Sequence, residues 1–283
     1  MTIRIVTDST CDLPKEILQE YGITVVPLYI HADSQVYQDG VDLTRNEFYK
    51  RLPGYKTSPT TAAPGPELFR QAYEHLAAEG ATEILSIHIS IKLSATVDSA
   101  HLAARETTVV PVTVFDSRQL SLGTGFQILT AIQAVKDGRS MTEILSLLEN
   151  QIPRTYVFAA LDTLEFMRRS GRMNFALSSL GTLMQIKPIL TMYDGEPGAE
   201  RVRTRRSAMN RLVELYKTYG PYQHVSLVHS HALERAKILK QEVESLLPVG
   251  EIMIEEINPV LGTHVGPGVV GFVVVSKTHS SGW

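Results

Sequence analysis

The sequence predicts an α/β protein built from two domains, and three observations support this prediction. The chain has 283 residues, more than one hydrophobic core usually organises. In its first half, β-branched runs alternate with amphipathic helical patterns, which favours a mostly parallel sheet with helices on both faces. This alternation changes near Gln151-Ile152-Pro153. We therefore expect a parallel α/β/α domain at residues 1–152 and a second α/β domain at residues 153–283.

The first half is expected to open with a strand over residues 3–6 and a short helix. Asp12 has the residue type of an N-cap for this helix, Pro14 lies in its first turn, and Gly22 ends it. A second strand, rich in β-branched residues, is expected over residues 23–30.

Two capping boxes mark later helices of the first half. Thr44 with Glu47, and Ser140 with Glu143, have the spacing in which each side chain bonds the other's backbone N–H. The remaining elements are expected in the order helix 66–79, strands 84–89 and 109–115, and helices 121–136 and 140–150.

The second half is expected to hold strands 156–161, 187–191, 224–229, 251–257 and 272–276, with helices after Asp162 and Phe175 and a helix over 232–247. Residues 257–276 lack Asp, Glu, Lys and Arg, and the stretch is long enough to suggest a membrane span. Its two prolines and four glycines would leave polar backbone groups unsatisfied in lipid. A buried loop followed by a strand is the better prediction.

Composition limits the class of protein. The chain is 43% apolar and 20% charged, as in average globular proteins. Its sole cysteine, Cys11, cannot form an internal disulfide, which suits a reducing cytoplasm. The net charge of −3 gives no reason to expect a nucleic acid partner.

Four short phrases rich in hydroxyl groups and glycine are the most informative motifs. Hydroxyls, backbone N–H groups and an imidazole can hold a small anion, and several of these phrases follow strands whose carboxyl ends are the usual ligand sites of parallel sheets. The chain shows no G-x-S-x-G elbow and no P-loop. The motifs therefore favour a carrier of an acidic small molecule. The phrases are residues 7–10, 57–61, 90–96 and 262–268.

Individual residues in these phrases also have structural explanations, which stay open. Ser90 and Ser94 precede a helical pattern, where hydroxyls either complete an anion site or cap the helix. His264 lies among glycines, where the backbone can approach a ligand closely. It either donates a hydrogen bond to an anion or is satisfied by the backbone.

An enzymatic alternative rests on three carboxylates. Asp8, Asp12 and Asp116 follow expected strands and suggest a metal-dependent phosphohydrolase or phosphotransferase, although their spacing fits no metal motif. Residues 266–271 match G-x-G-x-x-G but lead into a strand instead of a helix, so a dinucleotide site is not expected. We expect neither a metal nor a cofactor.

Nine motifs occur in order along almost the whole chain, from VTDSTCDLP at residues 6–14 to HVGPG at 264–268. Together they resemble the DegV family of bacterial fatty-acid-binding proteins. The motifs between them are VPL at 26–28, KTSP at 56–59, ISIKLSAT at 89–96, FDS at 115–117, LDTL at 161–164, GR at 171–172 and IKPIL at 186–190.

The resemblance implies one long-chain fatty acid buried between two α/β domains, with its carboxylate facing hydroxyls and a histidine. Motif matching assigns Thr57 or Ser58, Ser90 or Ser94, and His264 to this head-group site. The family likeness further implies a carrier without catalytic residues. It would present the acid to a separate dihydroxyacetone-kinase-like fatty acid kinase, which forms an acyl phosphate for phospholipid synthesis. A transient membrane contact is compatible with this role.

The carrier role suggests a function for a basic segment of the chain. Residues 168–211 contain nine Lys or Arg against three Asp or Glu, a net charge of +6. Arg172, Arg203 and Arg205 are expected to dock the kinase or to offset charge near the transferring phosphoryl group. Two other functions stay open: the phosphohydrolase above, and a scaffold that binds a protein partner through this basic surface and needs no pocket.

Overall fold

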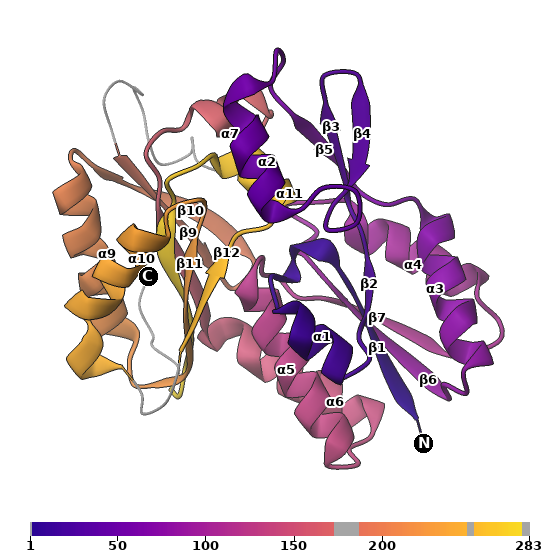
Figure 1. The fold of residues 1–283 in the computed structure, drawn as a ribbon. Coiled ribbons are helices and arrows are strands. Elements are labelled where there is room, and N and C mark those ends of the chain that lie inside the picture. Colours follow the sequence, from indigo (N-terminus) through magenta and orange to yellow (C-terminus); the bar gives the residue numbers. More distant parts are fainter. Residues whose placement is uncertain (1, 173–186, 248–251, 279–283) are drawn as a thin grey trace.

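A four-stranded parallel sheet organises the first half of the chain. The computed structural model describes residues 2–172, 187–247 and 252–278. The sheet has the order β2-β1-β6-β7, with β1 at Ile3–Asp8, β2 at Thr24–Val26, β6 at Glu83–His88 and β7 at Val112–Asp116. Helices cover both of its faces, as expected (Figure 1). They are α3 (Pro66–Ala78) and α4 (Thr96–Glu106) on one face, and α1 (Lys15–Glu20), α5 (Leu122–Lys136) and α6 (Met141–Gln151) on the other.

The single strand expected over residues 23–30 is wrong, because this stretch forms parts of two sheets. β2 ends at Val26, and β3 (Tyr29–Ala32) pairs with β4 (Gln35–Gln38) and β5 (Thr60–Ala62) in a small antiparallel sheet. Pro27 has no N–H to continue the ladder. The next amide, Leu28 N, donates to Ser9 Oγ at 3.2 Å instead.

Local capping was predicted well at two helices and wrongly at one. Both capping boxes are present, at the start of α2 (Arg45–Arg51) and of α6. Asp12 is not the N-cap of α1. That helix starts after Pro14 without a side-chain cap. Asp12 adopts a left-handed conformation, with φ of 55°, and its carboxylate bonds to Asn258 in the second half of the chain.

A six-stranded sheet organises the second half, with the order β10-β9-β8-β13-β11-β12. Its strands pair antiparallel except for β11 with β12. The fold is therefore a mixed α/β fold with a parallel sheet and further sheets, which confirms the predicted class. The expected helix after Phe175 and the motif residue Ile186 lie outside the described residues. The elements of this half are β8 (Thr155–Ala160), α7 (Glu165–Arg169), β9 (Lys187–Tyr193), β10 (Glu196–Val202), α9 (Arg205–Tyr219), β11 (Tyr222–His229), α10 (Leu233–Glu242), β12 (Met253–Glu256), α11 (Pro259–Val265) and β13 (Val270–Ser276).

The uncharged stretch 257–276 contains a helix where a loop was expected. Asn258 Oδ1 accepts from Leu261 N and Pro259 occupies the first turn of α11, and both are ordinary signals of a helix start. Gly262 is required there, because a Cβ atom at this position would lie 2.5 Å from Tyr49 Oη. The close approach of α2 thus explains a glycine that suggested a loop. The expected strand after it is confirmed as β13.

The two large sheets share one core. α5 lies between them (Figure 1), and its buried face joins a cluster that includes Ile5 of β1 and Val273 of β13. α9 and α10 cover the outer face of the second sheet. A domain boundary at residue 152 stays a prediction.

Single-turn 3₁₀ helices occupy Ser9–Cys11, Leu52–Gly54, Ile152–Arg154 and Glu244–Leu246.

Candidate ligand-binding site

An apolar cavity of about 250 Å³ lies between the two halves of the chain. The first half contributes the end of β5, the turns after β6 and β7, and the start of α5, while the second half contributes β8, β9, β10 and α11. Most of the wall is aliphatic, with Leu93 and Leu120 from the first half and Val157, Leu190 and Met192 from the second. Such a wall suits an elongated hydrocarbon.

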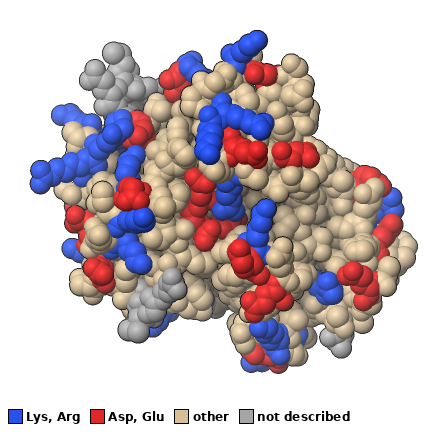
Figure 2. All heavy atoms as spheres, in the orientation of Figure 1, with Lys and Arg blue, Asp and Glu red and all other residues tan. Residues whose placement is uncertain are grey.

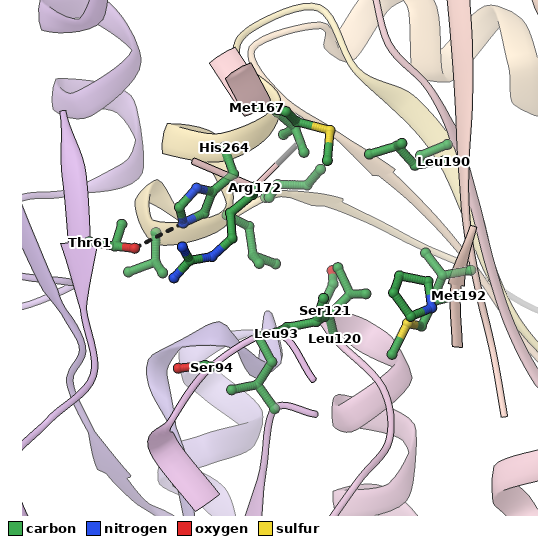
Figure 3. Close-up of a pocket in the computed structure, with 18 of the residues that line it drawn as sticks. Thr61, Leu93, Ser94, Leu120, Ser121, Met167, Arg172, Leu190, Met192 and His264 are labelled. Carbon is green, nitrogen blue, oxygen red and sulfur yellow. Dashed lines mark hydrogen bonds between the residues drawn. The ribbon is translucent and has the colours of Figure 1, made fainter. Parts of the chain in front are cut away.

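Four polar side chains lie together at one end of the cavity, away from Leu190 and Met192 (Figure 3). Thr61 comes from β5, Ser94 from the turn before α4, Arg172 from the segment after α7, and His264 from the last turn of α11. His264 Nε2 and Thr61 Oγ1 are 2.9 Å apart and share a hydrogen bond. The Arg172 guanidinium points toward this pair. The cavity therefore has a polar end and an apolar body.

His264 is a neutral hydrogen-bonding group at this end. Burial, and then the nearby Arg172 charge, lower its pKa to about 4. The imidazole is therefore uncharged near neutral pH, with a proton on one ring nitrogen only. Its Nδ1 atom is shielded from solvent and has no hydrogen-bond partner in the described part of the chain. An unsatisfied buried polar atom is costly, which marks this ring as unusual.

Arg172 brings a positive charge to the same place. Its side chain is half-buried and lines the cavity, and none of the ion pairs among the described residues involves it. Residues 173–186, which follow it in the chain, contain no Asp or Glu. A guanidinium at a hydrocarbon wall favours an anionic ligand, which would also pair with its forked donors.

The structure brings only two of the five expected head-group residues to the cavity, Ser94 and His264. Thr57 is exposed, and its N and Oγ1 atoms contact Asp33 Oδ1 at 3.1 and 3.3 Å. Ser58 and Ser90 do not line the cavity either. Ser90 Oγ accepts from Lys92 N at 3.3 Å within the turn after β6, and it does not cap α4, whose N-cap Ala95 makes no side-chain hydrogen bond.

The three expected partner-facing arginines lie in different settings. Arg172 is at the cavity, whereas Arg203 and Arg205 are exposed near the start of α9. Arg205 makes a forked contact to Asp162, at 3.0 and 2.8 Å, and 65% of its side chain stays exposed. Figure 2 shows Lys and Arg side chains gathered on the side of the molecule where α9 lies.

The three carboxylates of the enzymatic alternative do not converge. Asp12 bonds to Asn258 and Ser121, and Asp116 accepts from two backbone amides. Within residues 2–172, 187–247 and 252–278, no group of three or more His, Cys, Asp or Glu side chains could hold a metal ion. The arrangement does not favour a phosphohydrolase that uses these residues.

A hydrogen-bonded Ser86–His88–Asp8 chain lies inside the parallel sheet. Ser86 Oγ is 2.6 Å from His88 Nε2, and His88 Nδ1 is 3.1 Å from Asp8 Oδ2. The order of groups is that of a hydrolase triad. All three residues are fully buried, and Ser86 Oγ also bonds Tyr73 Oη at 2.8 Å. No substrate can reach this serine, so the chain is a structural link between β1 and β6.

Thr61 was not among the site residues expected from the sequence. Arg172 was expected to face a partner protein, whereas it lines the cavity. Thr61 belongs to the hydroxyl phrase 57–61, and alternation along β5 separates it from the exposed Thr60. Assigning 60–62 as a strand would have supplied that signal. The aliphatic wall carries no motif, because its members are scattered over the whole chain.

The fold and the site together define an α/β protein with an apolar cavity that ends in a cluster of polar groups. The model of the DegV family, described as uncharacterised proteins, matches residues 2–277. A DegV domain-containing protein of Deinococcus radiodurans is 40% identical over 276 residues, covering 96% of this chain and 97% of that protein. This chain belongs to the DegV family.

Solved structures extend the comparison to ligands. A DegV family protein from Thermus thermophilus, described for its fatty acid binding, is 36% identical, with a TM-score of 0.87 and coverage of 98% of this chain and 100% of that one. A stearic acid-binding protein from Eubacterium ventriosum is 27% identical, with a TM-score of 0.89 and coverage of 98% and 99%. Fatty acid binding is thus a property of family members. In the described ranges of this chain, no helix combines the length and apolar character needed to cross a membrane.

Proposed function

We propose that this protein binds one long-chain fatty acid in the cavity, with the carboxylate at the polar end. Arg172 is the observation that carries the proposal. Its guanidinium lies at the polar end of a largely aliphatic cavity and pairs with no carboxylate among the described residues. A partly buried cation is stabilised by an anion or by strong acceptors, and a fatty acid supplies an anion joined to a hydrocarbon chain.

The head-group site consists of Thr61, Ser94, His264 and Arg172. Ser94 Oγ and the His264 Nδ1–H donate to the carboxylate, Thr61 Oγ1 donates to His264 Nε2 and orients the ring, and Arg172 supplies the opposite charge. This assignment keeps Ser94 and His264 from the sequence-based expectation and adds the threonine that bonds His264. Thr57, Ser58 and Ser90 are left to support loops.

The acyl chain lies along the aliphatic wall toward Leu190 and Met192. The wall includes Val157 and Ala159 of β8, Leu190 and Met192 of β9, and Val260 and Leu261 of α11. Met167 and Met192 are flexible and polarizable and adapt to a chain of varying shape. Binding of stearic acid by the Eubacterium ventriosum relative supports a chain of this class.

The protein acts as a cytoplasmic carrier subunit for a separate kinase, which phosphorylates the bound carboxylate. Support comes from the cavity, whose described lining offers hydrogen-bond donors at its polar end, and from the basic surface. Arg203 and Arg205 are exposed near the start of α9 and suit an acidic docking surface or a phosphate. Because fatty acids partition into lipid, a transient membrane contact is part of this role.

Binding is tested with protein purified under native conditions, by extraction and mass spectrometry, followed by titration of the lipid-free protein with stearic acid. We expect a stoichiometric long-chain acid and saturable binding. Arg172→Ala is expected to weaken binding by about tenfold or more, the effect of losing one charge-assisted contact. Arg168→Ala, at an exposed position on α7, is the matched control. An empty protein that takes up no stearic acid would refute the proposal.

The docking step has its own test in the double variant Arg203→Ala/Arg205→Ala. Kinase-dependent formation of acyl phosphate is expected to fall, while the affinity for stearic acid stays the same because neither residue lines the cavity. Turnover equal to that of the wild type would show that these arginines are not part of the docking surface. It would not contradict the proposed binding of fatty acid.

A further inference from the structure

Asp12 is a buried carboxylate that lies behind the cavity and not in it. Only 1% of its surface is exposed. Asn258 N and Nδ2 both donate to its Oδ1 at 2.9 Å, and Ser121 Oγ donates to its Oδ2 at 2.6 Å. These partners are 246 and 109 residues away in sequence. Ser121 itself lines the cavity. The Asp12 carboxylate therefore bonds both a residue of the cavity wall and Asn258, which precedes the wall helix α11.

Asn258 connects Asp12 to His264. It is the N-cap of α11, where its Oδ1 accepts from Leu261 N at 2.9 Å. α11 has only seven residues, too few to be stable through its own hydrogen bonds. Its position therefore depends on its cap and on its packing. Leu261 and His264 of this helix both line the cavity.

Helix α2 holds the same segment from the other side. Arg45 donates to Glu256 O, and Tyr49 Oη donates to Ile257 O at 3.0 Å. An Arg45 guanidinium nitrogen also lies 3.3 Å from Asp12 Oδ1, which compensates the buried charge. The side chains of Asp12, Arg45 and Tyr49 therefore hold residues 256–258, which lead into α11. Of these three, Asp12 is the one that also bonds Ser121.

We propose that Asp12 is a positioning residue for the head-group site. Through Asn258 and α11, its carboxylate sets the place of His264 relative to Thr61 and Ser94. The inference rests on the proposed function, since it concerns the same polar end. Asp12 does not line the cavity, and its hydrogen bonds lead to the cavity through Asn258 at the start of α11 and through Ser121.

The experiment compares oleic acid with oleyl alcohol on lipid-free protein. The two probes share the hydrocarbon chain and differ at the head group, so their affinity ratio reports the geometry of the polar end. Asp12→Ala is expected to lower the preference for the acid by about tenfold, the size of one lost hydrogen bond to a charged group. Asp12→Asn keeps an acceptor for Asn258 and tolerates the left-handed backbone, so it is expected to retain most of the preference.

A paired substitution keeps the test decisive if Asp12→Ala does not fold. Asn258→Asp can still cap α11 but sets a second carboxylate against Asp12, and it is expected to lose the preference for the acid. Adding Asp12→Asn to Asn258→Asp removes that repulsion and is expected to restore it. Leu76→Ala, in a core cluster on the far side of the parallel sheet, is the control for lower stability without a change in the ratio.

The outcomes separate the inference from the function on which it rests. Wild-type protein that prefers oleic acid, together with Asp12→Ala and Asn258→Asp variants that keep the same preference, would overturn the positioning role and leave the carrier function intact. Wild-type protein that binds neither probe would overturn both. Restoration in the double variant, seen also as recovery of the His264 ring ¹⁵N shifts, supports the role, because Leu76→Ala controls for a general loss of stability.

Discussion

His88 is fully buried and His264 is half-buried, and the two differ in how far their ring nitrogens are satisfied. Both nitrogens of His88 have protein partners, in Asp8 and Ser86, and the ring packs against Phe69 at a centroid distance of 5.0 Å. His264 bonds only Thr61, and its Nδ1 has no partner among the described residues. An unpartnered ring nitrogen therefore distinguishes His264 from His88.

The difference separates a structural histidine from a ligand-binding one. Around His88 the protein has closed a chain of hydrogen bonds that joins two strands, and closed chains of this kind add rigidity. At His264, the Nδ1 atom has no hydrogen-bond partner among the described residues, and the ring lies beside the cavity and the Arg172 charge. We therefore expect substitutions near His88 to change stability and substitutions at His264 to change ligand affinity.

The largest expected effect is on stability, from Asp8→Ala. Burial by itself raises the pKa of Asp8, but His88, Thr10 and the Ile89 amide together hold it below its ordinary value. Removing this carboxylate leaves those donors unpaired inside the sheet. We expect the free energy of unfolding to fall by about 3–5 kcal/mol, measured by urea denaturation.

Asp98→Ala, an exposed residue of α4, is the control for Asp8→Ala and should change the unfolding free energy by less than about 0.5 kcal/mol. If Asp8→Ala is too unstable to study, Asp8→Asn is expected to show a smaller loss of the same sign. Stability equal to that of the wild type in both variants would mean that the Ser86–His88–Asp8 chain contributes nothing to the fold.

The opposite pattern is expected for His264→Leu. Leucine removes the hydrogen bond to Thr61 and one donor of the head-group site, so stearic acid binding should weaken by about tenfold or more. It also removes a buried nitrogen without a partner, so the free energy of unfolding of the empty protein should be unchanged or higher. Titration and urea denaturation of the same sample test both statements. If stability and affinity fell together, His264 would be a structural histidine like His88.

A pH titration sharpens the comparison without disturbing the core. Since the pKa of His264 is lowered to about 4 from an ordinary 6.5, the unfolded chain binds a proton in this interval that the folded chain does not. The contribution of this ring to stability is therefore complete above pH 6.5 and is lost as the pH falls toward 4, by up to about 1.4 kcal/mol per pH unit.

His264→Gln is expected to reduce this slope of stability against pH, whereas His101→Gln, at an exposed position, is the control. His229, whose pKa burial also lowers to about 4, contributes equally in all three proteins, so the difference between variants is the informative quantity. Saturation with stearic acid should flatten the wild-type slope, because a carboxylate beside the imidazole favours its protonated form. Equal slopes in all samples would contradict the assignment.

The elements of the fold were predictable where their signals are local, and the site was predictable only in part. Capping boxes at Thr44 and Ser140 and the strand–helix alternation depend on neighbouring residues, and the structure has them as expected. Thr61 and Thr57 lie in one phrase, but which of them meets His264 depends on the pairing of β5 with β3 and on the approach of α11. Asp12 likewise has the residue type of an N-cap, yet its partners come from residues 121 and 258. Contacts between distant segments leave no periodic pattern in a single sequence.

The smallest expected effect belongs to Tyr73→Phe, which trims the outer end of the chain of hydrogen bonds around His88. Tyr73 Oη bonds Ser86 Oγ at 2.8 Å, and Ser86 keeps its contact with His88 when the hydroxyl is removed. We expect a loss of about 1 kcal/mol in the free energy of unfolding and no change in stearic acid affinity, since Tyr73 lies in the core cluster of α3 and α4. A change in affinity instead would connect the buried chain to the cavity and erase the distinction between the two histidines.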